Sequence, residues 1–186
     1  MTTPIVFLRS ARLYLRPLEE ADLDRCQRWI NDPDVWSTLH MCRPMDAKAE
    51  KMWWDNQDRS SPPKSLNLAI VLKESHRHIG NAGIIGIDWI NRSAETGTLI
   101  GEKDCWGNGY ATEAKQAVLK YAFDTLNMHR MGSQVLATNE ASVRHLTGHG
   151  YVKEGIRRQA MFRNGQWVDL HVYGLLASEW RKRQTT

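Results

Sequence analysis

The sequence predicts one α/β domain in which helices flank a mixed sheet, and three observations favour this fold class. The chain has 186 residues, a length that suits a single hydrophobic core. Hydrophobic residues make up 41% of it and charged residues 25%, as in an ordinary folded domain. Segments with strand and helix patterns follow in the order strand, two helices, three strands, helix, strand, helix, two strands. We therefore expect residues 1–186 to form one domain.

The first 60 residues predict one strand followed by two helices. Residues 12–16 alternate polar and apolar side chains, as a half-buried strand does. Residues 19–30 place apolar side chains on one helical face, and Pro33 stops this helix, because proline disfavours the helical conformation in the residue before it. Residues 46–58 predict the second helix, with Asp46 as its N-cap. The apolar side chains of the two helices are Leu23, Cys26 or Gln27, Ile30, Met52, Trp53 and Trp54.

The middle of the chain predicts three strands and the strongest helix. Two apolar runs, residues 66–72 and 79–90, are joined by a polar turn, and residues 95–101 predict the third strand. Residues 110–126 then carry an apolar stripe with the three- and four-residue spacing of a helix. The stripe consists of Ala111, Ala114, Val118, Tyr121 and Ala122.

The last third predicts a strand over residues 131–138, a short helix over 141–147 and a closing hairpin. Asn164-Gly165 is a turn signal between two strand-like segments, residues 152–162 and 166–176. The strand–helix–strand unit before it favours parallel pairing of its two strands. Parallel pairing there and a hairpin at the end together predict a mixed sheet.

Charge and hydropathy indicate which classes of ligand and which cellular compartment to expect. The net charge of +4 fits an anionic ligand, although it also fits RNA or a ribosome surface. The only dense basic run is residues 181–183, so nucleic acid is not the expected partner. No apolar run approaches the ~18 residues of a membrane span, and the first 20 residues lack the order of a signal peptide. We therefore expect a cytoplasmic protein without a membrane partner.

Cysteine and histidine spacing predicts neither disulfides nor a metal site. Cys26, Cys42 and Cys105 are widely separated, without a CxxC pair, and are expected to be free thiols. No His/Cys/Asp group has the spacing of metal ligands.

The segment 104–114, DCWGNGYATEA, carries most of the functional information. It places Gly107 and Gly109 between a strand and the strongest helix, and glycines allow a ligand to approach the backbone closely. The free N–H groups at a helix N-terminus bind anions such as phosphate. The donors predicted here are Asn108, Tyr110, Ala111 and Thr112. The pattern is also that of a tight turn without a ligand, and it is not a Walker loop, because no Gly-Lys-Ser/Thr follows.

Residues 100–114, IGEKDCWGNGYATEA, resemble the acetyl-CoA signature of the GNAT superfamily, and in particular of its RimJ/RimL type, which includes ribosomal-protein N-terminal acetyltransferases. Further segments resemble the family in the same order and extend the match over nearly the whole chain. They are residues 12–17, 139–142, 148–151, 154–155, 164–169, 173–176 and 179–180.

The resemblance implies a GNAT fold, with a sheet of about seven strands that splays in the middle and about four flanking helices. It implies that acetyl-CoA is the cosubstrate and lies in the splay, and that a primary amine of a small molecule or a protein N-terminus attacks it directly in a ternary complex. It also implies a possible homodimer. The residues that the resemblance assigns to acetyl-CoA are Leu99, Ile100, Glu102, Gly107, Asn108, Gly109, Tyr110, Ala111, Thr112, Asn139 and Ser142.

The resemblance also implies the catalytic groups. Ser142 is the candidate acid near the CoA sulfur, because the tyrosine that many relatives carry four residues later is Leu146 here. A backbone N–H near Ile100 is the expected oxyanion donor. Glu95 precedes the central strand and is the candidate base, acting directly or through water. Met161 stands where some RimL-like enzymes have a glutamate, so that expected base is absent here. The further candidates are Tyr110 and Tyr151 as acids and His145 and His171 as bases.

Each assignment has a structural alternative. Ser142 also fits a first-turn serine bonded to the backbone, Asn139 a helix N-cap, and Glu95 a solvated carboxylate at a strand end. Two other functions stay open at this point. One is a CoA-binding sensor or regulatory module without turnover, and the other is an RNA- or ribosome-associated protein.

Overall fold

A computed structural model describes residues 5–39 and 44–184. Within this part of the chain, eight strands form one mixed sheet in the order β1-β2-β3-β4-β5-β6-β8-β7. Only β5 and β6 pair in parallel. The strands are β1 (Leu8–Arg9), β2 (Leu13–Pro17), β3 (Leu66–Leu72), β4 (His78–Asp88), β5 (Ser93–Ile100), β6 (Arg130–Leu136), β7 (Val152–Arg163) and β8 (Gln166–Leu176).

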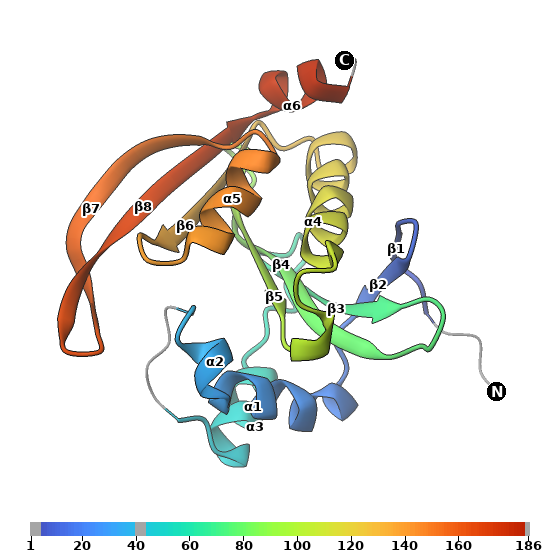
Figure 1. Cartoon of the computed structure of the whole chain (residues 1–186). Helices are drawn as coiled ribbons and strands as arrows, with labels where there is room; N and C mark the ends of the chain where they lie inside the picture. The colour runs from blue at the N-terminus through green and yellow to red at the C-terminus, as the bar shows by residue number, and fades with distance from the viewer. Residues whose placement is uncertain (1–4, 40–43, 185–186) are drawn as a thin grey trace.

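Six α-helices accompany the sheet in the described residues, with α1–α3 grouped on one side and α4 and α5 on the other (Figure 1). No helix in this part of the chain is long and apolar enough to cross a membrane. The helices are α1 (Leu23–Asn31), α2 (Pro33–Trp36), α3 (Ala47–Asp55), α4 (Tyr110–Lys120), α5 (Glu140–Gly148) and α6 (Ala177–Gln184).

The predicted fold class and element order are confirmed, and the differences have local causes. The two-residue β1, the four-residue α2 and the C-terminal α6 are additions that the sequence patterns did not indicate. Pro33 ends α1, as predicted, but it also begins α2, because its fixed φ suits the first turn of a helix. The helix predicted over residues 110–126 changes after Lys120 into a π-helical turn, η3 (Tyr121–Thr125).

The two faces of the sheet carry separate cores. On the α4–α5 side, side chains such as Ile79, Val118 and Phe123 form the larger cluster. On the α1 side, Trp29 and Val35 pack with strand residues in the smaller one. The helix face of α1 is therefore Leu23, Cys26 and Trp29, where the sequence pattern had placed Ile30. Both faces of the central strands are covered.

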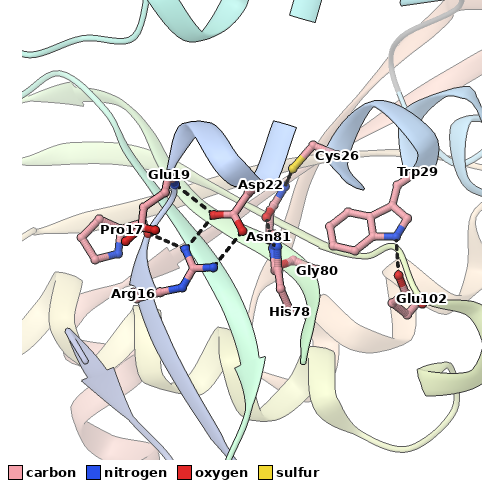
Figure 2. Close-up of polar contacts among 10 residues, drawn as sticks. All are labelled: Arg16, Pro17, Glu19, Asp22, Cys26, Trp29, His78, Gly80, Asn81 and Glu102. Atoms are coloured by element: carbon pink, nitrogen blue, oxygen red, sulfur yellow. Dashed lines mark hydrogen bonds and ion pairs between the residues drawn. The ribbon is translucent and has the colours of Figure 1, made fainter. Parts of the chain in front are cut away.

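A buried polar network attaches the α1–α3 group to the sheet (Figure 2). Asp22, in the short helical turn η1 (Glu20–Asp22) before α1, is 3% exposed and accepts two hydrogen bonds from Arg16 on β2, at 2.6 and 2.8 Å. Its Oδ1 also lies 3.1 Å from Nδ1 of the buried His78 on β4. Asn81 extends the network by accepting from His78 and donating to the Cys26 sulfur of α1.

The network holds Asp22 ionised. Burial raises the pKa of this carboxyl, but the two hydrogen bonds from Arg16, together with the proximity of His78, outweigh burial and keep the pKa well below its usual range. The group therefore contributes stability that is fully present above the unfolded pKa of about 3.9 and is lost as the pH falls below it.

The variant Asp22→Asn is expected to lower the free energy of unfolding at pH 7 by about 3 kcal/mol, because it leaves a buried positive charge without its partner. Urea denaturation measures the change. Asp24→Asn is the matched control, since Asp24 is exposed in the same segment, and its effect should stay within about 0.5 kcal/mol.

The same pair tests the pH dependence. Wild type should lose stability more steeply than Asp22→Asn between about pH 4 and pH 2, because only wild type must protonate this carboxyl. Parallel acid-denaturation curves for the two proteins would contradict the assignment.

Candidate active site

The sheet opens between β5 and β6 after three paired residues. Parallel pairing joins Ser93–Glu95 to Arg130–Gly132 and then stops. Beyond this point β5 continues with β4 as far as Ile100, and β6 continues with β8 as far as Leu136. The two strands therefore diverge toward their carboxyl ends, which confirms the predicted splay (Figure 1).

Backbone groups of β5 face this gap without a neighbouring strand. The Gly101 N–H donates to the Ile79 carbonyl of β4. The Leu99 carbonyl lies so close to Gly80 of β4 that a Cβ added there would collide with it. The Gly101 N–H and the Leu99 carbonyl are therefore directed toward β4. Because backbone groups alternate in direction along a strand, the backbone N–H and C=O groups of Thr98 and Ile100 are directed toward the gap. The Thr98 hydroxyl oxygen is also buried, with no hydrogen-bond partner among the described residues. An extended polar ligand would supply the missing partners.

The glycine turn presents backbone amides beside the gap. Gly107 and Gly109 have φ values of 74° and 78°, a left-handed conformation that favours glycine. The first helical hydrogen bond of α4 runs from Glu113 to Gly109. The amides of residues 110–112 therefore precede the helical ladder, and Gly109 offers them no capping side chain. This is the geometry of an anion site at a helix N-terminus.

Arg12, in the turn before β2, holds the glycine turn in place by hydrogen bonds to it and to the first turn of α4. Its backbone N–H and its Nε donate to the Glu113 carboxylate at 2.5 and 2.8 Å, and its NH1 donates to the Asn108 carbonyl at 3.0 Å. The guanidinium also lies 4.5 Å from the centre of the Tyr110 ring. The alternating pattern of residues 12–16 predicted Arg12 only as part of a strand, because no local pattern indicates a contact 101 residues away.

The side chain of Glu102 is directed away from the gap. Its carboxylate accepts from the Trp29 indole at 3.0 Å and forms an ion pair with Arg77, and Arg77 also binds Asp104 (Figure 2 shows the Trp29 contact). The Trp106 indole donates to the Ile100 carbonyl at 2.8 Å. These contacts hold the segment between β5 and α4 in place. The Glu102 backbone is also bonded within the protein, because its N–H donates to the Ile79 carbonyl and its carbonyl accepts from the Cys105 N–H.

The N-terminus of α5 lies next to β6. Asn139 is the N-cap of this helix, because its side-chain oxygen accepts from the Ser142 N–H at 3.0 Å. The Asn139 amide also lies 3.5 Å from the Thr38 carbonyl after α2. The half-buried Ser142 hydroxyl has no hydrogen-bond partner in the part of the chain that the structure describes, and it is free to bond a ligand.

Glu95 lies at the closed end of the gap, on the α1–α3 face of the sheet. Strand alternation puts it opposite the buried Ala94 and Thr96, which face α4. Its carboxylate accepts from the Gln134 amide of β6 at 2.9 Å and remains exposed. A pocket of about 270 Å³ adjoins it, lined in part by Arg130 and Gly132. The larger pocket, of about 670 Å³, lies between α1, α2 and Lys103 and includes none of the predicted site residues.

The other candidate residues lie in different surroundings. Leu146, 1% exposed, and Tyr151 are core residues on the α5 side, and the Tyr110 ring packs under Arg12. Met161 lies on the outer strand β7, and the Nδ1 atom of His171 is buried without a partner among the described residues.

The cysteines that the structure describes are free thiols, as predicted. Cys26 and Cys105 are buried, and burial raises the pKa of both, that of Cys26 to about 11. Such thiols are poor nucleophiles at neutral pH. Cys42 lies outside the described residues. Within the described ranges, no group of three His, Cys, Asp or Glu side chains is placed to hold a metal ion.

Comparison with known proteins agrees with this geometry. A family model for the acetyltransferase (GNAT) domain matches residues 12–152. The uncharacterised N-acetyltransferase p20 of Bacillus licheniformis is 33% identical over 175 residues, which cover 93% of this chain and 97% of the relative. Spermidine N(1)-acetyltransferase of Vibrio cholerae is 26% identical over 94% of this chain and 98% of its own length.

A solved structure shares the fold. The spermidine N-acetyltransferase from Vibrio cholerae in complex with CoA and spermine superimposes with a TM-score of 0.81 and 25% identity, covering 91% of this chain and 98% of that one. The splayed sheet, the glycine turn and the family match lead to one conclusion. The chain belongs to the GNAT acetyltransferase family and is an acyltransferase.

Proposed function

We propose that this protein transfers an acetyl group from acetyl-CoA to a primary amine, by direct attack of the amine within a ternary complex. The observation that carries the proposal is the position of an anion-binding helix N-terminus beside a gap between two diverging strands. The helix N-terminus suits the charged diphosphate of CoA, and the gap suits its extended pantetheine arm.

The described residues fit this cosubstrate. The amides of residues 110–112 and the glycines before them suit the diphosphate. The gap-facing backbone groups of Thr98 suit an amide of the pantetheine arm. The Thr98 hydroxyl, which has no partner among the described residues, suits a polar group on the same arm. Asn139 and Ser142, at the N-terminus of α5, are proposed to meet the thioester end.

Residues on both faces of the sheet take part in the proposed reaction. Glu95, on the α1–α3 face, is proposed to take a proton from the incoming ammonium, directly or through water, which leaves a neutral nucleophile. The Ile100 N–H is proposed to donate to the carbonyl oxygen as negative charge develops on it. When the carbon–sulfur bond breaks, the Ser142 hydroxyl is proposed to give its proton to the departing thiolate and to regain a proton from the nitrogen of the new carbon–nitrogen bond, which leaves a neutral amide and CoA.

The acceptor class is a small amine or a protein N-terminus. The Vibrio cholerae relative acts on spermidine, and the sequence resemblance to RimJ/RimL enzymes favours a protein N-terminus. The exposed carboxylate of Glu95 suits the ammonium group that both classes share.

Thiol release from acetyl-CoA tests the proposal, measured with spermidine, other small amines and peptides with free N-termini. Turnover with one class is the expected result. CoA binding without turnover for every acceptor would support the sensor hypothesis instead, and no CoA binding at all would overturn the proposed site.

Gly109→Ala is expected to weaken CoA binding about tenfold or more. An alanine at φ 78° is strained, and relief of this strain would displace the amides that follow. Isothermal titration with CoA measures the effect. Gly155→Ala is the control, because Gly155 lies on β7 with open space where its Cβ would be. Equal CoA affinity of the two variants would contradict the role of the glycine turn.

Ser142→Ala and Glu95→Gln are expected to lower kcat by about 100-fold each, the lower range for loss of a general acid or base, with little change in the Kd for CoA. Steady-state kinetics across pH 6–10 measures this. Asp124→Asn, in η3 after α4 and at an exposed ion pair with Lys120, is the control and should keep wild-type rates. A kcat within threefold of wild type would remove either residue from the mechanism.

A further inference from the structure

Lys115 is a buried lysine that the proposed chemistry does not use. It lies on the inner face of α4 and is only 2% exposed. Its ammonium or amine nitrogen, Nζ, donates a hydrogen bond to the Thr96 hydroxyl of β5 at 2.7 Å. None of the salt bridges in the described part of the chain includes it. Buried lysines without a carboxylate partner are rare, because the charged form is expensive to remove from water.

Thr96 joins β5 to three other parts of the chain, the first of which is α4 through Lys115. Its hydroxyl oxygen also lies 2.8 Å from the hydroxyl of Tyr151, which follows α5. Its carbonyl accepts from the Ser133 hydroxyl of β6 at 3.2 Å. Thr96 is the first residue of β5 beyond the parallel pairs, so this junction lies where the gap begins. It connects the helix that carries the glycine turn, the strand that lines the gap and the segment after the Ser142 helix.

The surroundings of Lys115 contain no compensating negative charge. From α5, His145 lies close to it, and burial with the proximity of Lys115 and His149 lowers the pKa of His145 to about 3. The Tyr151 ring lies 5.9 Å from Nζ, and burial raises the pKa of this phenol. Glu95, on the same strand as Thr96, points to the opposite face. Burial accordingly lowers the pKa of Lys115 to about 7.

Stability alone does not explain a lysine at this place. Methionine has a similar length and fills such a site without the desolvation of an amine. A residue that lowers stability and is nevertheless present at an active site is commonly there for function.

We propose that Lys115 is a positioning residue for acetyl-CoA, which fixes α4, β5 and the segment after α5 against one another through Thr96. The inference rests on the proposed function of the gap. Without the Lys115–Thr96 hydrogen bond, the glycine turn and the gap-facing groups of β5 no longer keep the spacing that a single CoA molecule must span.

Lys115→Met tests this, with Lys120→Met as the matched control on the exposed face of the same helix. Lys115→Met should raise Tm by about 4 °C or more at pH 6.5. It should also raise the Kd for CoA and the KM for acetyl-CoA at least tenfold while leaving the KM of the amine unchanged. A more stable protein with wild-type CoA affinity would overturn the proposal, since the lysine would then have no positioning role.

Thr96→Val provides the second arm. It should weaken CoA binding to the same extent and lower Tm, because the buried amine and phenol lose their common partner. The double variant Lys115→Met/Thr96→Val should bind CoA no more weakly than either single variant and should recover Tm. Additive losses of affinity would show that Lys115 does not act through Thr96.

The pH dependence of Tm checks the state of the amine. Between about pH 7 and 10 only the unfolded chain holds this proton, so wild-type stability rises with pH, and the Tm advantage of Lys115→Met should shrink over this range. A constant advantage would overturn the assignment. Tm and CoA affinity need no turnover, so the absence of an acetyl acceptor would count against the proposed function and leave this inference standing.

Discussion

The early end of the pairing between β5 and β6 is the constraint on which the site depends. Three residue pairs hold the two strands together, and beyond them each strand keeps only its outer neighbour. A sheet that closed normally would satisfy its own backbone groups and leave nothing for a ligand. Because it opens here, β5 presents unpaired groups in the middle of a covered sheet, and the N-termini of α4 and α5 lie beside the opening.

Contacts between distant segments keep this opening in shape. Arg12 supports the glycine turn from the N-terminal strand pair, and Arg77 and Trp29 hold Glu102 on the other side. Below the gap, Thr96 joins β5 to α4, β6 and the segment after α5. The site is thus supported by contacts from most of the chain.

Two buried ionisable groups, Asp22 and Lys115, illustrate different uses of polar residues. Asp22 is compensated by Arg16 and His78, and its network attaches the α1–α3 group to the sheet (Figure 2). Lys115 has a hydroxyl as its partner and His145 close to it, and no carboxylate in the described part of the chain forms an ion pair with it. The first arrangement stabilises the fold, and the second lies where three parts of the site join.

The sequence by itself determined the local features of this protein, because each of them depends on neighbouring residues. The periodicity of the strands and helices, the caps at Asp46 and Asn139 and the glycine turn before α4 were all predicted from such patterns. Only the tertiary structure decided that Thr98 faces the gap, that Glu102 turns away from it, and that Arg12 and Lys115 support it. Strand register and burial bring residues together across up to 101 positions, and no local pattern specifies such distances.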